Sequence, residues 1–183
     1  RRLMSDLRVP INEQDHVFGP ADAPVTLVEY GDYQCPHCQA AWPEVERVLR
    51  HFGHGLRYVY RHFPLWTVHP MAKPAAEAAE FAGAHGQFWD MHAAIFANGH
   101  HLSGPMLITL ARALGLDPVA LQAALEQGVY TARVDADLIG GARSGVNGTP
   151  CFFVNGKRHN GPHDAMSLSA AIDAATLKVG GAL

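Results

Sequence analysis

Two cysteines separated by two residues, Cys35 and Cys38, come directly after a short apolar segment, Val25–Val28. The segment that follows them has apolar residues on one face of a helix, at Ala41, Trp42, Val45, Val48, Leu49 and Phe52. Cysteines with this spacing either bond reversibly to each other or bind a metal ion. We therefore expect redox or metal chemistry at a strand-to-helix turn.

Cys35 is expected to be the reactive member of the pair. It would lie at a helix N-terminus, where unpaired N–H groups and the helix dipole favour an anion. Only the thiolate attacks, so a lowered pKa makes Cys35 a better nucleophile at pH 7 and a better leaving group. His37, between the two cysteines, can add a positive charge or a hydrogen bond to the sulfur. Stabilising the thiolate stabilises the reduced form, so the disulfide would be oxidising.

Two other interpretations of the pair stay open at this point. A zinc site needs four ligands, of which the pair supplies two, and no second close-spaced ligand pair is present. Cys151 and one histidine can complete such a site. A structural disulfide between residues three apart would be strained and easily reduced. The pattern favours a reversible redox pair over both.

Composition and net charge argue against several classes of protein. The 183 residues are 48% hydrophobic and 17% charged, which is typical of one globular domain with or without an insertion. The net charge of −3, without a run of lysine or arginine, gives no case for binding nucleic acid or an anionic membrane. No apolar stretch approaches the roughly 20 residues of a membrane-spanning helix. Three cysteines are too few for a disulfide scaffold.

The beginning of the chain shows no signal peptide. The first three residues are basic and apolar, but Met4–Gln14 is mostly polar, and the chain does not begin with Met. We expect either a bacterial cytoplasmic protein or a mature or excised domain that acts outside the cytoplasm. We also expect a monomer.

The helices and strands that must position the cysteines can be predicted from the spacing of hydrophobic residues and from the glycines and prolines that end such elements. Aromatic and β-branched runs predict strands at about 24–30, 56–63, 151–155 and 157–161, the last two joined by an Asn155-Gly156 turn. Helical spacing predicts a helix at about 36–52, a purely helical segment from about 69 to 144 with caps at Ser103 and Asp117, and a last helix capped by Asp164. Pro43 should kink the first helix.

This order, βαβ, helices, then ββα, predicts an α/β fold with three parts. Residues 1–20 form an irregular or extended N-terminal arm. Residues 21–66 and 145–183 form one domain, and residues 67–144 are a helical insertion between its strands. The first strand–helix–strand unit implies a right-handed crossover and a parallel strand pair.

The stretch from Glu29 to Cys38 resembles the active-site region of the thioredoxin superfamily, and Cys-Pro-His-Cys with a long helical insert resembles its DsbA-like branch. Three spacings support the resemblance. Glu29 lies six residues before Cys35, Pro43 lies five residues after Cys38, and Thr149-Pro150 precedes the penultimate strand. The resemblance covers about residues 16–178 and implies a thioredoxin fold with a central mixed sheet.

The region from Gly145 to Gly156 is similar to DsbA-like domains found alone or fused to other bacterial proteins, including sodium/proton antiporters. The resemblance therefore implies a thiol:disulfide oxidoreductase that acts on protein or peptide clients. It implies no cofactor beyond the redox-active disulfide, and a redox partner that the sequence does not identify.

The resemblance also implies a role for each matching residue. Cys35 forms the mixed disulfide with the client, and Cys38 resolves it. Glu29 assists proton transfer to or from Cys38, because a carboxyl group buried in an apolar strand has a raised pKa. It can instead be a satisfied carboxylate at the edge of the core.

The same resemblance assigns client contacts to Pro36, Thr149 and Pro150. A cis Pro150 would expose the backbone groups of Thr149 to an extended client.

Cys151 departs from the family pattern, in which a small residue such as threonine commonly follows the proline. It is either a small buried core residue or a third thiol close enough to Cys35 and Cys38 to form another disulfide or a metal site. We predict that most of the protein keeps the Cys35–Cys38 bond.

Other side chains that can do chemistry are expected to be structural. Most of the twelve histidines, including His51, His54, His100 and His101, are expected at the surface, whereas His62, His69 and His92 are expected in the core or a groove. Phe63, Trp66 and Phe88 are expected in the core, and some of them can line a client groove.

Three functions compete on these observations. The first is an enzyme that oxidises, reduces or isomerises protein disulfides, and Cys-Pro-His-Cys favours oxidation. The second is a metal-binding or redox-sensing module that uses Cys35, Cys38 and Cys151. The third is a glutathione-dependent enzyme of the kappa type, against which Cys38 argues because that type lacks the second cysteine.

Overall fold

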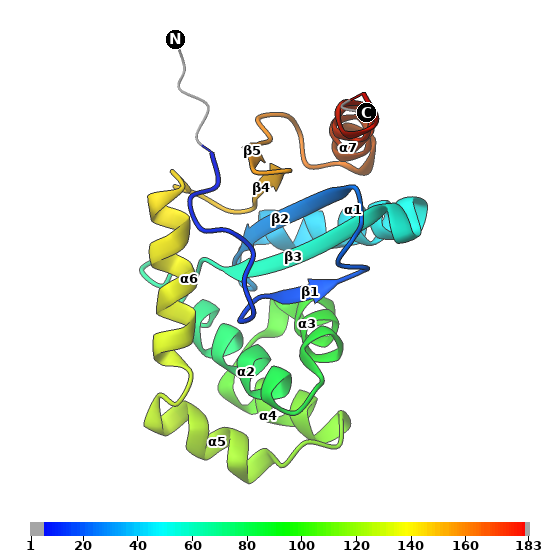
Figure 1. Cartoon of the computed structure of the whole chain (residues 1–183). Helices are drawn as coiled ribbons and strands as arrows, with labels where there is room; N and C mark the ends of the chain where they lie inside the picture. The colour runs from blue at the N-terminus through cyan, green and yellow to red at the C-terminus, as the bar shows by residue number, and fades with distance from the viewer. Residues whose placement is uncertain (1–5, 182–183) are drawn as a thin grey trace.

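Strand β2 (Val25–Gly31) is the central strand of a five-stranded mixed sheet in the computed structural model, which describes residues 6–181 (Figure 1). The strands lie in the order β1 (His16–Phe18), β3 (Leu56–His62), β2, β4 (Cys151–Val154) and β5 (Lys157–Arg158). β2 pairs in parallel with β3 and antiparallel with β4. This is the thioredoxin fold that the sequence predicted.

Helix α1 (Pro36–Phe52) makes the crossover between the parallel strands β2 and β3. All residues of β2 are buried, as expected for a strand covered on both faces, and Glu29 is its one charged side chain. Proline at the first helical position fits the start of α1, because its fixed φ suits a helix and its missing N–H leaves no partner unsatisfied. The turn therefore delivers Cys35 to the helix N-terminus.

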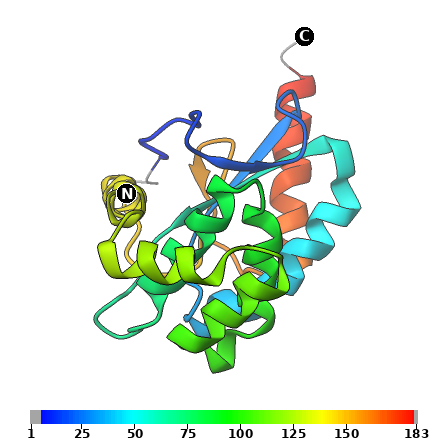
Figure 2. The same cartoon turned by 90° about the horizontal axis from the view of Figure 1, so that it is seen from below.

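Alternate residues of β2 face two different cores. Leu27 belongs to the larger core, which packs against α1, α7 (Ala165–Gly180) and most of the helices between β3 and β4. Val28 and Tyr30 face a smaller core that includes Leu138 of α6 (Thr131–Arg143). Helices α1 and α7 pack against each other on the face of the sheet that carries Leu27 and the larger core (Figure 2).

Between β3 and β4 the described chain is helical, as predicted. The elements are α2 (Ala72–Ala84), α3 (Phe88–Ala97), the short 3-10 turn η2 (Gly99–His101), α4 (Gly104–Ala113), α5 (Pro118–Gln127) and α6. Three predicted caps are confirmed, since Ser103, Asp117 and Asp164 each accept a backbone N–H with the side chain. The predicted turn is confirmed too, with φ values of 47° at Asn155 and 80° at Gly156.

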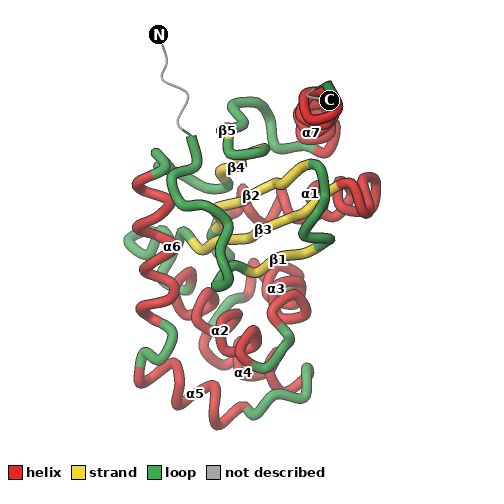
Figure 3. The backbone as a smooth tube through the Cα atoms, in the orientation of Figure 1, coloured by secondary structure: helices red, strands yellow, loops and turns green. Residues whose placement is uncertain are grey.

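Residues 1–20 were expected to form an irregular or extended arm, and within it the structure has a strand at residues 16–18 that the sequence did not predict. These residues form β1, which pairs antiparallel with β3, and the preceding segment runs along the sheet to reach it (Figure 3). A three-residue strand has too short a pattern to be predicted, and its pairing comes from β3. Residues 1–5 lie outside the described residues, and the division at residues 20, 66 and 144 stays a prediction.

The expectation that Trp66 lies in the core is wrong, because its side chain is 61% exposed. It lies in the loop between β3 and α2. Phe63 and Phe88 are buried as expected, and so are His62 and His92. The predicted return strand at 157–161 is shorter than expected and ends at Arg158. Among the described residues, no helix is long and apolar enough to span a bilayer.

Candidate active site

Cys35 is the N-cap residue of α1, and Cys38 lies inside the first turn. Both are buried, and both are free thiols in this structure, which therefore shows the reduced pair. The backbone N–H of Asp32 donates a hydrogen bond to Cys38 Sγ at 3.4 Å. The second sulfur is thus held inside the turn, whereas the first lies where the helix begins.

The carboxylate of Asp32 fixes this turn. Its Oδ1 accepts the backbone N–H groups of Gln34 at 2.8 Å and Cys35 at 3.1 Å. Its Oδ2 accepts the N–H of Leu65 at 2.9 Å and Nδ1–H of His69 at 2.8 Å. Asp32 was not among the residues predicted from the sequence to act at the site. An aspartate three residues before a helix N-cap is typical of an Asx turn, and that signal identifies it.

The pKa of Cys35 is lowered from 9.0 to about 5. The largest cause is a hydrogen bond from the Cys38 thiol, which outweighs the opposing effect of burial. The side chain of Thr149 and the backbone N–H groups of His37 and Cys38 lower it further. At neutral pH Cys35 is therefore a thiolate, the nucleophilic form.

Thr149 faces Cys35 from the loop before β4. Its carbonyl oxygen lies 3.6 Å from Cys35 Sγ, and its peptide bond to Pro150 is cis. Its buried hydroxyl makes no full hydrogen bond among the described residues, but it faces the Cys35 sulfur closely enough to lower the pKa of that thiol. The hydroxyl hydrogen is therefore available to the Cys35 thiolate.

Cys38 and Glu29 share a dry environment beneath the turn. Burial raises the pKa of Cys38 well above its ordinary value, and Cys35 and the charge of Glu29 raise it further. Burial also raises the pKa of Glu29 from 4.5 to about 7, although a hydrogen bond from the Tyr58 hydroxyl opposes this. Cys38 therefore holds its proton, and the nearby carboxyl group can gain or lose one near neutral pH.

Aromatic side chains keep this environment dry. The Tyr33 hydroxyl lies 2.8 Å from Nδ1 of His92, and both rings are buried. Burial lowers the pKa of His92 well below its ordinary value, so its ring is neutral. The rings of Tyr60 and Trp42 each lie 4.5 Å from that of His92.

Pro36 and His37 lie at the exposed tip of the turn. His37 affects Cys35 through its backbone N–H, whereas the sequence suggested its ring.

Cys151 is separate from the pair. Its side chain belongs to the smaller core with Val28 and Phe153, whereas Cys35 and Cys38 belong to the larger one. Burial raises the pKa of Cys151, with an opposing effect of Arg158. In the described part of the chain, one group of three His, Cys, Asp or Glu ligand atoms lies within 4.8 Å, and the cysteines are not in it. The sheet thus does not gather the three sulfurs.

A protein-family model described as thioredoxin matches residues 11–174. The structure of a thioredoxin-like oxidoreductase from Silicibacter pomeroyi is similar, with 30% identity, a TM-score of 0.76 and coverage of 90% of this chain and 93% of that one. Oxidised BdbD from Bacillus subtilis is 22% identical with a TM-score of 0.84, covering 95% and 97% of the two chains, and shares the fold.

Among curated proteins, a protein of Salinispora arenicola named Na(+)/H(+) antiporter NhaA 1 is 46% identical over 171 residues. The match covers 93% of this chain and 26% of that protein. The chain therefore spans about a quarter of the length of the curated relatives that it matches.

Proposed function

Because the chain belongs to the thioredoxin family, we propose that it is a DsbA-like thiol–disulfide oxidoreductase that exchanges disulfides with protein clients through Cys35 and Cys38. The observation that carries the proposal is the difference between the two sulfurs. Cys35 begins α1 with its pKa lowered to about 5, whereas Cys38 is buried with its pKa raised. One sulfur is suited to attack and leave, and the other to hold a proton.

We propose that the pair acts as an oxidase of client thiols. A client thiolate attacks Cys35 Sγ in the Cys35–Cys38 disulfide, that bond breaks, and Cys38 leaves. A second client thiolate then attacks the client sulfur of the mixed disulfide, and Cys35 leaves as a thiolate. The client loses two electrons and gains a disulfide, and the pair gains the two electrons.

Glu29 supplies the proton that Cys38 needs on leaving. The raised pKa of Cys38 makes a free thiolate at this position costly, so departure is easier when a proton arrives with it. Glu29, with a pKa of about 7, can carry a proton at neutral pH. It regains a proton from those that the client thiols release.

The oxidising direction rests on the stabilised Cys35 thiolate. A thiolate exists only in the reduced form, so every hydrogen bond that favours it makes the disulfide a stronger oxidant. The same steps in reverse make a reductase or isomerase, and a reduction potential distinguishes them. A redox partner would re-form the disulfide by the same kind of exchange.

Client contacts are proposed around the turn. Pro36 is exposed beside Cys35, and the Thr149–Pro150 loop presents backbone groups to an extended peptide. The loop that Asp32 anchors carries two exposed apolar residues, Trp66 and Val68, which are 61% and 66% exposed. An unfolded client can therefore bury apolar side chains there while its thiol reaches Cys35.

Oxidative refolding of a reduced, disulfide-containing model protein tests the proposal. The oxidised protein should restore client disulfides, and Cys35→Ser should abolish this. In Cys38→Ser the Cys35 thiolate should attack a disulfide-bonded client, release one client thiolate and accumulate as a mixed disulfide that Cys38 can no longer resolve. Cys151→Ser is the matched control and should stay active. Loss of activity only in Cys151→Ser, or refolding by Cys35→Ser, would overturn the proposal.

A further inference from the structure

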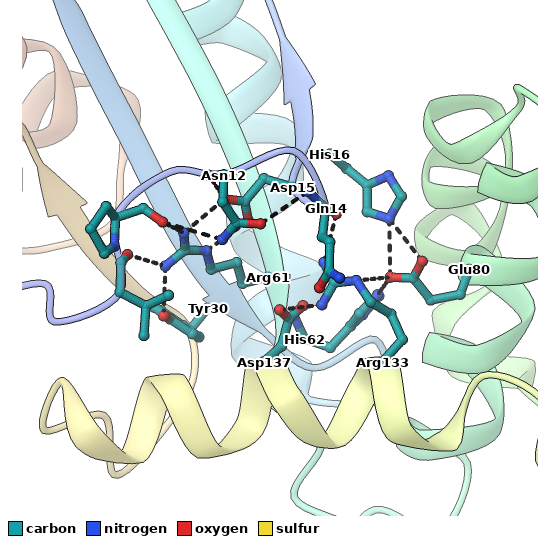
Figure 4. A network of polar contacts seen from close by, with 12 residues as sticks. Asn12, Gln14, Asp15, His16, Tyr30, Arg61, His62, Glu80, Arg133 and Asp137 are labelled. Carbon is teal, nitrogen blue, oxygen red and sulfur yellow. Dashed lines mark hydrogen bonds and ion pairs between the residues drawn. The ribbon is translucent and has the colours of Figure 1, made fainter.

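A second group of reactive side chains, His16, His62 and Glu80, lies where the N-terminal segment and β3 meet α2 (Figure 4). Nε2 of His16 lies 3.0 and 2.9 Å from the two carboxylate oxygens of Glu80. Nε2 of His62 lies 2.9 Å from Oε1 of the same carboxylate. All three ligand atoms lie within 4.8 Å of one another. Two imidazoles thus turn the same ring nitrogen toward one carboxylate.

Three different elements bring these residues together. His16 comes from β1, His62 from the end of β3 and Glu80 from α2. The His62 and Glu80 side chains are 1% and 7% exposed, whereas His16, at 17%, leaves a path to solvent. Nδ1 of His62 is buried without a partner among the described residues, so Nε2 is its one bonding atom here. The group is therefore preorganised and nearly dry.

The surrounding charges leave one negative charge unbalanced. The network joins three carboxyl groups, Asp15, Glu80 and Asp137, to two guanidinium groups, Arg61 and Arg133. With both imidazoles neutral, one further cation would neutralise this network.

We propose that His16, His62 and Glu80 bind one divalent first-row transition-metal ion of the zinc type. Two imidazoles and a carboxylate are ligands that such ions accept, with one position left for water. Bond lengths of about 2.0–2.2 Å in a tetrahedral site place ligand atoms about 3.3 Å apart. The observed separations of 2.9–3.0 Å need to widen by a few tenths of an ångström.

The ion would act as a clip between parts of the fold. It would hold β1 and the sheet to α2, and Arg133 would extend the connection to α6 through its contacts with Glu80 and Asp137. The alternative occupant is a proton, in which case an imidazolium and the carboxylate form a hydrogen-bonded lock without metal. The two differ in whether a metal binds with defined stoichiometry.

Titration of the whole chain with Zn2+ tests the proposal. A Cys35→Ser/Cys38→Ser background removes the dithiol, which would otherwise bind zinc. We expect one Zn2+ per chain by calorimetry, and Co2+ should give the absorption of a nitrogen- and oxygen-ligated site without thiolate bands. Glu80→Gln, which keeps a hydrogen-bond acceptor, should weaken binding about 100-fold or more.

His100→Gln/His101→Gln is the matched control, because this exposed pair in η2 offers an adventitious site. It should bind Zn2+ unchanged, and Zn2+ should raise the Tm of this control but not that of Glu80→Gln. His16→Gln, at the partly exposed edge, replaces Glu80→Gln if the latter does not fold. Absence of stoichiometric binding, or a Zn2+ affinity in Glu80→Gln or His16→Gln as high as that of the background protein, would overturn the metal site and leave the hydrogen-bonded lock.

Discussion

At the scale of single residues, the pKa values of two cysteines in one helical turn are shifted in opposite directions. The hydrogen bond between them is the largest reason that the pKa of Cys35 falls, and it helps to raise that of Cys38. The backbone N–H groups at the N-terminus of α1 and the side chain of Thr149 also lower the pKa of Cys35. Burial and the charge of Glu29 raise the pKa of Cys38. Cys35 is therefore suited to attack, and Cys38 to hold a proton.

Cys35 should therefore react with alkylating agents at acidic pH. In the reduced protein we expect the alkylation rate to rise with a midpoint near pH 5, because that is where the thiolate forms. Cys38→Ala removes the largest stabilising hydrogen bond, so its midpoint should move upward, while Cys151→Ala should leave it unchanged. A midpoint near 8.5 in the unmodified protein would contradict this assignment.

Glu29 should make stability fall as pH rises. Its pKa is about 7 when folded and 4.5 when unfolded, so between these values the native state holds a proton that the unfolded state has lost. The free energy of unfolding then decreases with pH, by up to about 3 kcal/mol in total. Glu29→Gln should lose this dependence, and the exposed Glu13→Gln should keep it. Urea unfolding from pH 4.5 to 8 measures the difference, and parallel curves for all three proteins would refute it.

At the scale of elements, the turn from β2 to α1 depends on a loop that is remote in sequence. Asp32 accepts hydrogen bonds from its own turn and from Leu65 and His69 in the loop after β3. The position of Cys35 and the shape of that loop are thus set by one buried carboxylate.

Asp32→Ala should cost about 3 kcal/mol or more, because it leaves buried backbone N–H groups without an acceptor. It should also raise the pKa of Cys35, since the turn no longer holds the sulfur at the helix N-terminus. Asp117→Ala removes a cap of α5 that is far from the dithiol in sequence and should cost about 1 kcal/mol. Alkylation of Cys35 should change only in Asp32→Ala, and an unchanged midpoint there would argue against the positioning role.

Local spacing explains what could be predicted from the sequence. Cys35, Cys38, Glu29 and the Thr149–Pro150 loop carry their signals in neighbouring residues, as do the helix caps. The contact of Asp32 with His69 joins positions 37 residues apart and leaves no such signal. The same holds for β1, whose pairing is set by β3, and for the side of the sheet on which Cys151 lies.

At the scale of the whole molecule, the N-terminal segment is fastened to the sheet through Arg61. This buried guanidinium donates to both carboxylate oxygens of Asp15, to the carbonyls of Val9 and Pro10 and to the Tyr30 hydroxyl (Figure 4). Every direction in which it can donate is thereby used, so a cation is held in the core without an unpaired charge.

Asp15→Asn should therefore cost about 3–5 kcal/mol, because it leaves the buried guanidinium without its counter-ion. The pair is 2% exposed on both sides. The double variant Asp15→Asn/Arg61→Met should recover part of the loss. Asp6→Asn breaks an exposed pair with Lys157 and should cost about 0–1 kcal/mol. Equal urea midpoints for Asp15→Asn and Asp6→Asn would contradict the fastening role.

The proposed function requires that Cys35 and Cys38 cycle between the dithiol and the disulfide. An equilibrium titration against defined thiol–disulfide ratios, with the bonded cysteines identified by mass mapping, tests this most directly. We predict one two-electron couple, a Cys35–Cys38 disulfide in the oxidised form, and a reduction potential between about −200 and −120 mV. A potential near about −270 mV would contradict the oxidase direction, and a pair that forms no such disulfide would contradict the function itself.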